Sequence, residues 1–229
     1  MTLALNLINP SMKAILHTFM QIDDRDIAKI PMHGPLILAT NHINSLDAPI
    51  GFSHLHPRDL TAFVKVETWN NPLLAMLFNL WHGIPIRRGE VDMDAFHQAQ
   101  DALLKDKKIV IIAPEGTRSW DGKLKKGYPG IVLLAIRSGV PILPVVFYGN
   151  EAVGQNLRSL RRTNITIRVG EPFTIDFSHQ TLSREFREEV TDEVMYQIAM
   201  LLPETYRGVY TDLSRATTRH LRFLSEKMN

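Results

Sequence analysis

The chain has 229 residues, of which 45% are hydrophobic and 22% charged; this composition excludes wholesale disorder and allows a sizeable core. It has no cysteine, which excludes a disulfide framework, a thiolate zinc site and a cysteine nucleophile. With 26 basic and 24 acidic residues the net charge is only +2, so the overall balance gives no reason to expect a nucleic-acid partner.

Residues 2–22 are apolar but interrupted. Asn6, Pro10 and Lys13 break the stretch, and a spanning helix needs about 20 nearly uninterrupted apolar residues. A signal peptide would need a basic segment before the apolar stretch, and no such segment precedes this one. Pro10 suits the first turn of a second helix, and the following side chains recur at helical spacing: Leu5, Ile8, Met12, Ile15, Leu16 and Phe19. The segment therefore either packs on its own domain or lies in a membrane interface without crossing it.

Beyond this segment, short apolar runs alternate with amphipathic stretches. Strands are expected at 36–40, 60–66, 83–88, 109–113, 140–147 and 165–169. Helices are expected from Ser45 or Asp47 onward, and at 69–81, 92–104, 130–138 and 182–202. This alternation predicts an α/β fold in a single domain with a largely parallel sheet. We expect an N-terminal amphipathic helical segment over 1–30 and the main domain over 31–229.

His42 follows a predicted buried strand, and Asp47 lies five residues further on across a strand-to-helix turn. At this spacing the carboxylate can orient one imidazole nitrogen and leave the other free to accept a proton. Two simpler interpretations compete: Asp47 caps its helix, or His42 only bonds a loop carbonyl. A metal site is not expected here, because His54 and His56 fall beyond the intervening helix.

A second group of residues, 113–119, also follows a predicted buried strand. Gly116 and Thr117 permit a tight turn whose amides could face an anion, and Arg118 offers a planar charged fork for phosphate. Glu115 could hold this arginine or bind an acceptor hydroxyl. We prefer an anion site for Arg118 and for Arg88, which lies at another strand end, and a solvated surface for the nearby lysines: Lys123, Lys125 and Lys126.

Four ordered blocks resemble those of the glycerolipid acyltransferases, most closely the bacterial lysophosphatidate acyltransferases of the PlsC-like group. The resemblance covers about residues 34–150. The blocks are Asn41-His42…Asp47, Gly83-Ile84-Pro85-Ile86-Arg87-Arg88-Gly89, Pro114-Glu115-Gly116-Thr117-Arg118-Ser119 and Val140-Pro141-Ile142-Leu143-Pro144-Val145. Asn44 stands where the first block of relatives often has serine.

The resemblance implies a mixed, mainly parallel sheet flanked by helices, and acyl transfer from acyl-CoA or acyl-carrier protein to a lysophospholipid hydroxyl. The expected acceptor is 1-acyl-sn-glycerol-3-phosphate, giving phosphatidic acid for phospholipid biosynthesis. His42 matches the general base and Asp47 its orienting partner. The residues that match substrate-binding positions are Lys65, Arg88, Glu115, Gly116, Thr117 and Arg118.

The resemblance implies no metal and no cofactor, since the thioester is a substrate. It implies partners at a membrane surface, with the protein peripheral on the cytoplasmic face. Three alternatives stay open: a lipid or thioester hydrolase, transfer to another lysolipid or to glycerol-3-phosphate, and a catalytically silent lipid-binding module.

Overall fold

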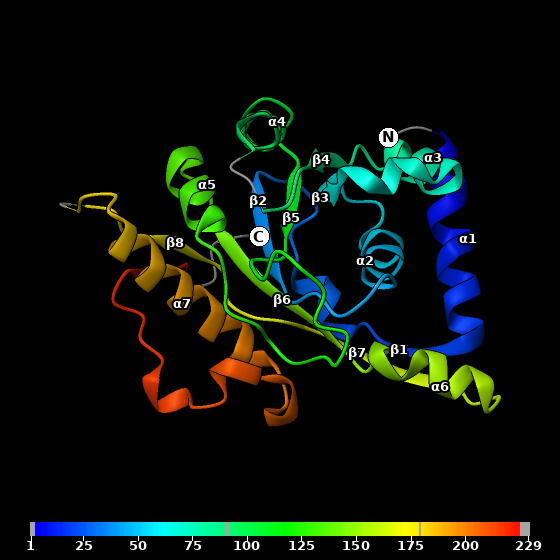
Figure 1. Cartoon of the computed structure of the whole chain (residues 1–229). Helices are drawn as coiled ribbons and strands as arrows, with labels where there is room; N and C mark the ends of the chain where they lie inside the picture. Colours follow the sequence, from blue (N-terminus) through cyan, green and yellow to red (C-terminus); the bar gives the residue numbers. More distant parts are fainter. Residues whose placement is uncertain (1–2, 90–91, 179, 225–229) are drawn as a thin grey trace.

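A mixed β-sheet runs through the molecule, and helices cover both of its faces (Figure 1). The computed structural model describes residues 3–89, 92–178 and 180–224. Within these ranges nine strands form the sheet, in the order β1-β7-β6-β2-β5-β3-β4, with β8 pairing β6 and β9. The strands are β1 Met20–Asp23, β2 Leu36–Thr40, β3 Leu60–Lys65, β4 Ile84–Ile86, β5 Ile109–Ile112, β6 Ile142–Tyr148, β7 Thr163–Val169, β8 Phe173–Ile175 and β9 Leu221–Phe223.

The centre of the sheet is parallel and its β7 and β8 side is antiparallel. Strand β2 lies between β5 and β6 and runs parallel to both. Strands β3 and β4 continue the parallel part, whereas β7 and β8 each pair antiparallel with β6. The sheet is therefore mixed and mainly parallel, as expected.

Seven α-helices of the described ranges pack on the two faces. Helices α1 and α2 lie on one face, and α4, α5 and α7 on the other (Figure 1). The helices are α1 Leu3–Phe19, α2 Asp47–Leu55, α3 Pro72–Leu80, α4 Met93–Leu104, α5 Gly130–Ser138, α6 Val153–Arg158 and α7 Arg184–Leu201. None of the described helices has the length and apolar content needed to cross a bilayer.

Strand β2 shows why the central strands are apolar throughout. Leu36 and Leu38 point into the core beneath α1 and α2, while Ile37 and Ala39 point into the core beneath α4, α5 and α7. All four are at most 1% exposed. Because successive residues of a strand face opposite sides, a sheet covered on both faces needs an unbroken apolar run, which is the pattern that predicted this strand.

The predicted α/β fold is confirmed, but two expectations for the N-terminal segment are wrong. A single helix runs from Leu3 to Phe19 through Pro10, rather than beginning again there. The helix also ends before residue 20, because Met20–Asp23 pairs with β7 as a parallel edge strand. The domain boundary at residue 30 stays a prediction, and residues 1–2, 90–91, 179 and 225–229 of the predicted units lie outside the described residues.

Candidate active site

The carboxyl ends of the central strands bring together loops that are distant in sequence. Asn41 follows β2, and its side-chain amide donates to the Phe147 carbonyl on β6 at 2.8 Å. The Phe147 N–H donates back to Asn41 Oδ1 at 2.9 Å. Asn41 is 2% exposed, so its side chain forms a buried pair of hydrogen bonds that fixes the loop after β2 against β6. Ligand sites of parallel sheets lie at this edge.

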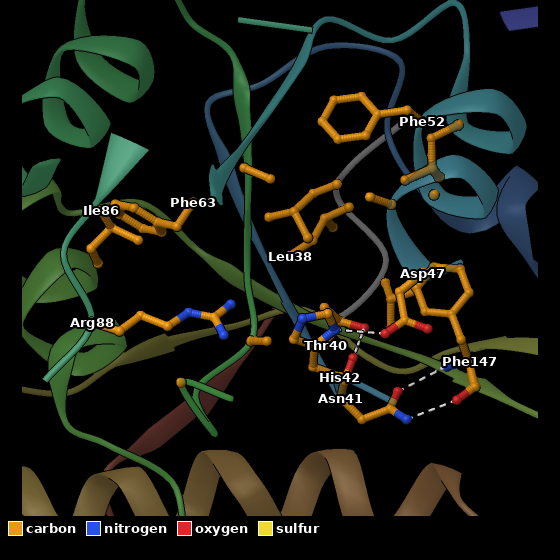
Figure 2. A pocket seen from close by; sticks show the side chains of 18 residues that line it. Leu38, Thr40, Asn41, His42, Asp47, Phe52, Phe63, Ile86, Arg88 and Phe147 are labelled. Carbon is orange, nitrogen blue, oxygen red and sulfur yellow. Dashed lines mark hydrogen bonds and ion pairs between the residues drawn. The ribbon is translucent and has the colours of Figure 1, made fainter. Parts of the chain in front are cut away.

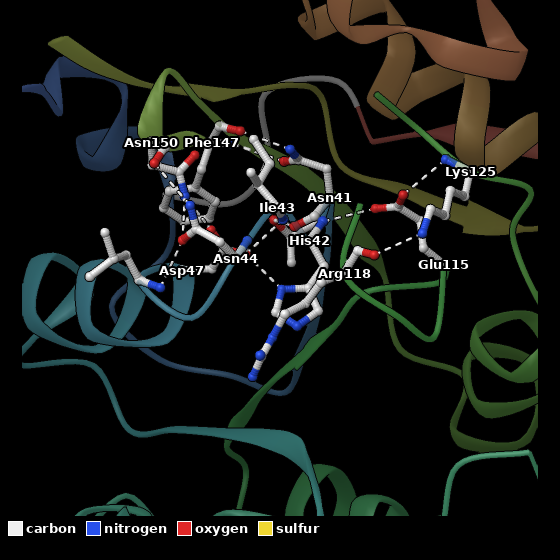
Figure 3. A network of polar contacts seen from close by, with 12 residues as sticks. Asn41, His42, Ile43, Asn44, Asp47, Glu115, Arg118, Lys125, Phe147 and Asn150 are labelled. Atoms are coloured by element: carbon white, nitrogen blue, oxygen red, sulfur yellow. Dashed lines mark hydrogen bonds and ion pairs between the residues drawn. The ribbon is translucent and has the colours of Figure 1, made fainter. Parts of the chain in front are cut away.

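His42 and Asp47 form the predicted pair (Figure 3). His42 Nδ1 lies 2.6 Å from Asp47 Oδ2. An ionised carboxylate can only accept, so Nδ1 carries the proton and the lone pair is on Nε2. The His42 and Asp47 side chains are 20% and 11% exposed. The imidazole is therefore oriented by a partly buried carboxylate, while its other nitrogen remains available to a ligand.

Asp47 accepts more hydrogen bonds than a helix cap would. Its Oδ2 also accepts the backbone N–H groups of Ile43 at 2.8 Å and Asn44 at 3.0 Å. Its Oδ1 accepts the Asn150 side-chain amide. Asp47 is the first residue of α2 and none of these donors belongs to that helix. The carboxylate therefore organises the preceding turn as well as the imidazole, and helix capping does not account for its position.

Glu115 supports the His42 backbone from the other side (Figure 3). One of its oxygens accepts the His42 N–H at 2.8 Å, and the other accepts the Lys125 N–H at 2.9 Å. The residue is 1% exposed. Burial raises the pKa of Glu115 to about 7, against the opposing effect of the two N–H donors. In this position the carboxyl ties the loops after β2 and β5 together; its predicted contact with an acceptor stays a prediction.

Two arginines from different strand ends lie close to the histidine. Arg88 follows β4 and lines the same pocket as His42 (Figure 2). Partial desolvation at the pocket edge lowers the pKa of Arg88, and the positive charge of Arg118 lowers it further. Arg118 Nε is buried and has no hydrogen-bond partner within the described ranges, and the guanidinium lies 5.3 Å from the Trp120 ring centroid. Two neighbouring cations, Arg88 exposed and Arg118 partly buried, attract an anion.

The loop that carries Arg118 is fixed to the loop that carries His42. The Ser119 N–H donates to the His42 carbonyl at 2.8 Å, and the Trp120 N–H donates to the Ile43 carbonyl at 3.0 Å. The two predicted groups, which follow β2 and β5, are therefore one structural unit. Their mutual orientation is set by the backbone as well as by side chains.

An apolar pocket opens beside the imidazole and runs between the sheet and α2 (Figure 2). Its polar groups come from Thr40, Asn41, His42, Asp47 and Arg88. Side chains from the sheet and from α2 supply its apolar walls, among them Leu38, Phe52, Leu55, Phe63, Ile111 and Val145. A polar edge joined to an apolar interior suits a ligand with a charged head and a hydrocarbon chain.

The remaining predicted site residues are placed less centrally. Gly116 lines the pocket with φ of +65°, and its N–H donates to the Ala113 carbonyl, so this amide is used by the turn itself. Thr117 is exposed. Lys65 ends β3 opposite Ile86 of β4 and is not part of the pocket wall described above. Substrate contacts of these three residues stay predictions.

Asn150 is the residue that the sequence interpretation missed. It is fully buried, and its amide reaches both Asp47 and Asn44. Asn44 in turn donates to the Asn150 carbonyl and accepts the Leu46 N–H. Asn150 comes directly after β6 and its closing glycine, so the rule that residues at strand ends form sites could have found it.

A sequence model of the family described as Acyltransferase matches residues 21–148, more than half of the chain. The chain therefore belongs to the acyltransferase family. Its α/β fold is also that of the crystal structure of the 1-acyl-sn-glycerophosphate acyltransferase PlsC from Thermotoga maritima. The TM-score is 0.63 at 23% identity, over 86% of this chain and 78% of that one.

Curated relatives carry two different names. A 1-acyl-sn-glycerol-3-phosphate acyltransferase of Limnanthes alba is 31% identical over 61% of this chain and 50% of its own length. The human 1-acyl-sn-glycerol-3-phosphate acyltransferase beta is 27% identical over 56% and 46%. An N-acylphosphatidylethanolamine synthase of Arabidopsis thaliana is 26% identical over 97% and 88%. The chain thus spans about half the length of the first two relatives.

Proposed function

We propose that this protein transfers a fatty acyl group from a thioester to the free hydroxyl of a lysophospholipid, with 1-acyl-sn-glycerol-3-phosphate as the preferred acceptor. The observation that carries the proposal is the His42–Asp47 pair at the polar end of an apolar pocket that Arg88 also lines. The names of the matched relatives support the class of acceptor. The acyl donor is acyl-CoA or an acyl-carrier protein.

In the proposed reaction His42 Nε2 removes the proton of the acceptor hydroxyl as its oxygen attacks the thioester carbonyl. A carbon–oxygen bond forms and a tetrahedral intermediate results. The carbon–sulfur bond then breaks, and the imidazolium returns the proton to the departing thiolate. Asp47 stabilises the imidazolium and holds the tautomer. No covalent acyl-enzyme intermediate forms, because the acceptor hydroxyl attacks the thioester directly, as a serine nucleophile would in other acyl-transfer enzymes.

The paired arginines are proposed to hold the phosphate of the acceptor. The charge of Arg118 acts on Arg88, so an anion between the two guanidinium groups would relieve their repulsion. The unpartnered Nε of Arg118 offers one donor for it. Phosphate binding at this position would leave the acceptor's glycerol hydroxyl to reach His42, and the apolar pocket would receive an acyl chain.

We also propose that the protein binds the surface of a membrane through the outer sides of α1 and α3. Leu3, Leu7 and Ile15 of α1 are 86%, 70% and 60% exposed, and Leu73 and Met76 of α3 are 67% and 54% exposed. The two helices are linked through Trp81, which directly follows α3 and whose indole N–H donates to Asn9 Oδ1 of α1. Exposed apolar side chains on neighbouring helices are typical of an interfacial surface.

Liposome sedimentation tests this surface. The double substitution Leu7→Asp/Ile15→Asp should reduce the bound fraction without lowering the melting temperature, because both side chains are exposed. Leu104→Asp is the matched control, since Leu104 is 42% exposed but lies on α4 across the sheet. Equal binding by the double variant and the control would reject the surface.

A donor-by-acceptor panel tests the reaction. Purified protein is given acyl-CoA or acyl-carrier protein, with lysophosphatidate, other lysophospholipids, glycerol-3-phosphate, phosphatidylethanolamine or no acceptor, and the products are separated by mass. Phosphatidic acid formation that requires His42 supports the proposal. An N-acylated product would assign the amine acceptor named for the Arabidopsis relative, and thioester loss without an acylated lipid would make the protein a hydrolase.

A further inference from the structure

A second group of histidine and carboxylate side chains lies away from the candidate active site. His17 is in the last turn of α1, His54 is in the last turn of α2, and Asp24 follows β1. One potential ligand atom of each residue lies within 4.8 Å of the other two. His17 Nε2 and His54 Nε2 are 3.2 Å apart. His54 lies about 10 Å along α2 from Asp47, at 1.5 Å per residue, so the group is separate from the His42 pair.

The second ring nitrogen of His54 is fixed by the fold. His54 is 3% exposed, and its Nδ1 lies 3.0 Å from the Ile50 carbonyl one turn earlier. The Ser53 hydroxyl also lies 3.0 Å from Nδ1, but it donates its proton to the Pro49 carbonyl at 2.6 Å. A carbonyl can only accept, so the contact with Ile50 places the proton on Nδ1, and Nε2 presents its lone pair toward His17. Metal-binding histidines use this arrangement, in which one nitrogen donates to a carbonyl and the other binds the ion.

The spacing of the two imidazole nitrogens fits a tetrahedral ion. Zinc–nitrogen bonds of 2.0–2.1 Å at a tetrahedral angle place two ligand nitrogens about 3.3 Å apart. We propose that His17, His54 and Asp24 bind a divalent transition metal of the zinc class, with a fourth coordination position open to water. Two neutral imidazoles and one carboxylate form a donor set that suits zinc and its neighbours rather than magnesium or calcium.

Lys13 competes with the ion for the carboxylate. Its ammonium lies 2.8 Å from Asp24 Oδ2, and the two side chains are 38% and 32% exposed. The ion pair is thus accessible to solvent and uses one of the two carboxylate oxygens. Metal binding needs the other oxygen, or displacement of Lys13 into water. The affinity is therefore lower than it would be without Lys13.

A metal in this position would fasten the end of α1 to α2. His17 belongs to the helix that carries the exposed apolar side chains Leu7 and Ile15, while His54 belongs to the buried helix that begins with Asp47. The bound ion would connect the two helices and the turn after β1. Its expected effect is on the stability of the folded state, through preferential binding.

The test uses the full chain without an affinity tag, freed of metal with a chelator and then dialysed. Co²⁺ is added first, because its visible absorption bands report four-coordinate geometry, and Zn²⁺ then displaces it. One equivalent should bind. Zn²⁺ at about a hundred times its Kd should raise the melting temperature by about 5–10 °C.

His17→Gln and Asp24→Asn are the decisive variants, since both side chains are partly exposed and their replacements keep the size. Each should weaken Zn²⁺ binding at least tenfold. Lys13→Gln should tighten it. His97→Gln is the matched control, because His97 is exposed on α4 and should leave the affinity unchanged. Failure of the wild-type chain to bind either ion with a Kd below about 100 μM, or unchanged affinity in His17→Gln, overturns the proposal.

Discussion

Each end of helix α2 holds a histidine, His42 through Asp47 at the start and His54 in the last turn, and the two are oriented in the same way but have different surroundings. At the N-terminal end, the Asp47 carboxylate accepts a hydrogen bond from His42 Nδ1, and Nε2 of this histidine faces the pocket. At the C-terminal end, the Ile50 carbonyl accepts a hydrogen bond from His54 Nδ1, and Nε2 of this histidine contacts His17. Burial lowers the pKa of His54 to about 4, so it is neutral at pH 7.

The difference teaches that fixing a tautomer does not by itself define a function. A carboxylate beside Nδ1 stabilises an imidazolium, and so suits a histidine that must gain a proton during a reaction. A carbonyl in a buried site offers far less support for a positive charge, and so suits a histidine that stays neutral. The acceptor of Nδ1 therefore decides how readily each of these two histidines takes up a proton.

The largest expected effect follows from removing the base. His42→Ala should lower acyl-transfer turnover by about 10²–10⁴-fold and leave the melting temperature within a few degrees of wild type, because the imidazole contributes a proton acceptor and little packing. Asp47→Asn should cause a comparable loss through the wrong tautomer. Turnover and thermal melts measured on the same preparations check both, and a His42→Ala protein that keeps more than about a tenth of the activity contradicts the mechanism.

At the C-terminal end of α2 the opposite pattern is expected, a loss of stability without a loss of turnover. His54→Ala removes a 3% exposed side chain and its hydrogen bonds. The free energy of unfolding should fall by about 3 kcal/mol. Urea unfolding in the presence of chelator measures this without a metal contribution. Turnover of the folded fraction at a temperature well below the melting midpoint should be unchanged, and a loss as large as that of His42→Ala would erase the distinction between the two ends.

Glu115 should make stability depend on pH. Its pKa is raised from 4.5 to about 7 by burial, so between these values the folded state holds a proton that the unfolded state has released. The stabilisation is complete below pH 4.5 and is lost as pH rises through 7. It amounts to at most about 3 kcal/mol at 1.36 kcal/mol per pKa unit.

Comparison with Glu115→Gln isolates this effect, because the amide does not titrate. The wild-type minus variant difference in the free energy of unfolding should fall steadily between pH 5 and pH 8. The opposite contribution of His54, whose pKa is lowered, cancels in this difference. A difference that stays flat across the range would show that Glu115 is ionised in the folded state at pH 5.

The smallest of these effects concerns the phosphate. Arg118→Gln and Arg88→Gln should each raise the apparent acceptor KM by about ten- to a hundredfold, the equivalent of 1.5–3 kcal/mol for a charge-assisted contact. The donor KM should change much less. Initial rates with each substrate varied separately distinguish the two, and a change confined to the thioester KM would assign the arginines to the donor instead.

The sequence predicted the central strands and the His42–Asp47 pair because both are local patterns. An apolar run between turn signals identifies β2 or β5, and five residues separate the histidine from its carboxylate. Strand β1 escapes prediction, because the run from Leu16 to Ile22 has helical spacing and gives no local sign of pairing with β7 some 143 residues later. Asn150 and the His17–His54 contact depend likewise on packing between distant segments.

The buried hydrogen bonds between Asn41 and Phe147 also determine when the site can assemble during synthesis. These two hydrogen bonds join residues 106 positions apart, and Asp47 depends on Asn150 over a similar distance. A growing chain that has emerged as far as Arg118, six residues beyond the end of β5, already holds His42, Asp47 and Arg118, but not β6, which fixes the loop after β2. Strand β6 must therefore be synthesised before the histidine can be held in place, so a chain that terminates between residues 118 and 142 contains every predicted site side chain but no assembled site.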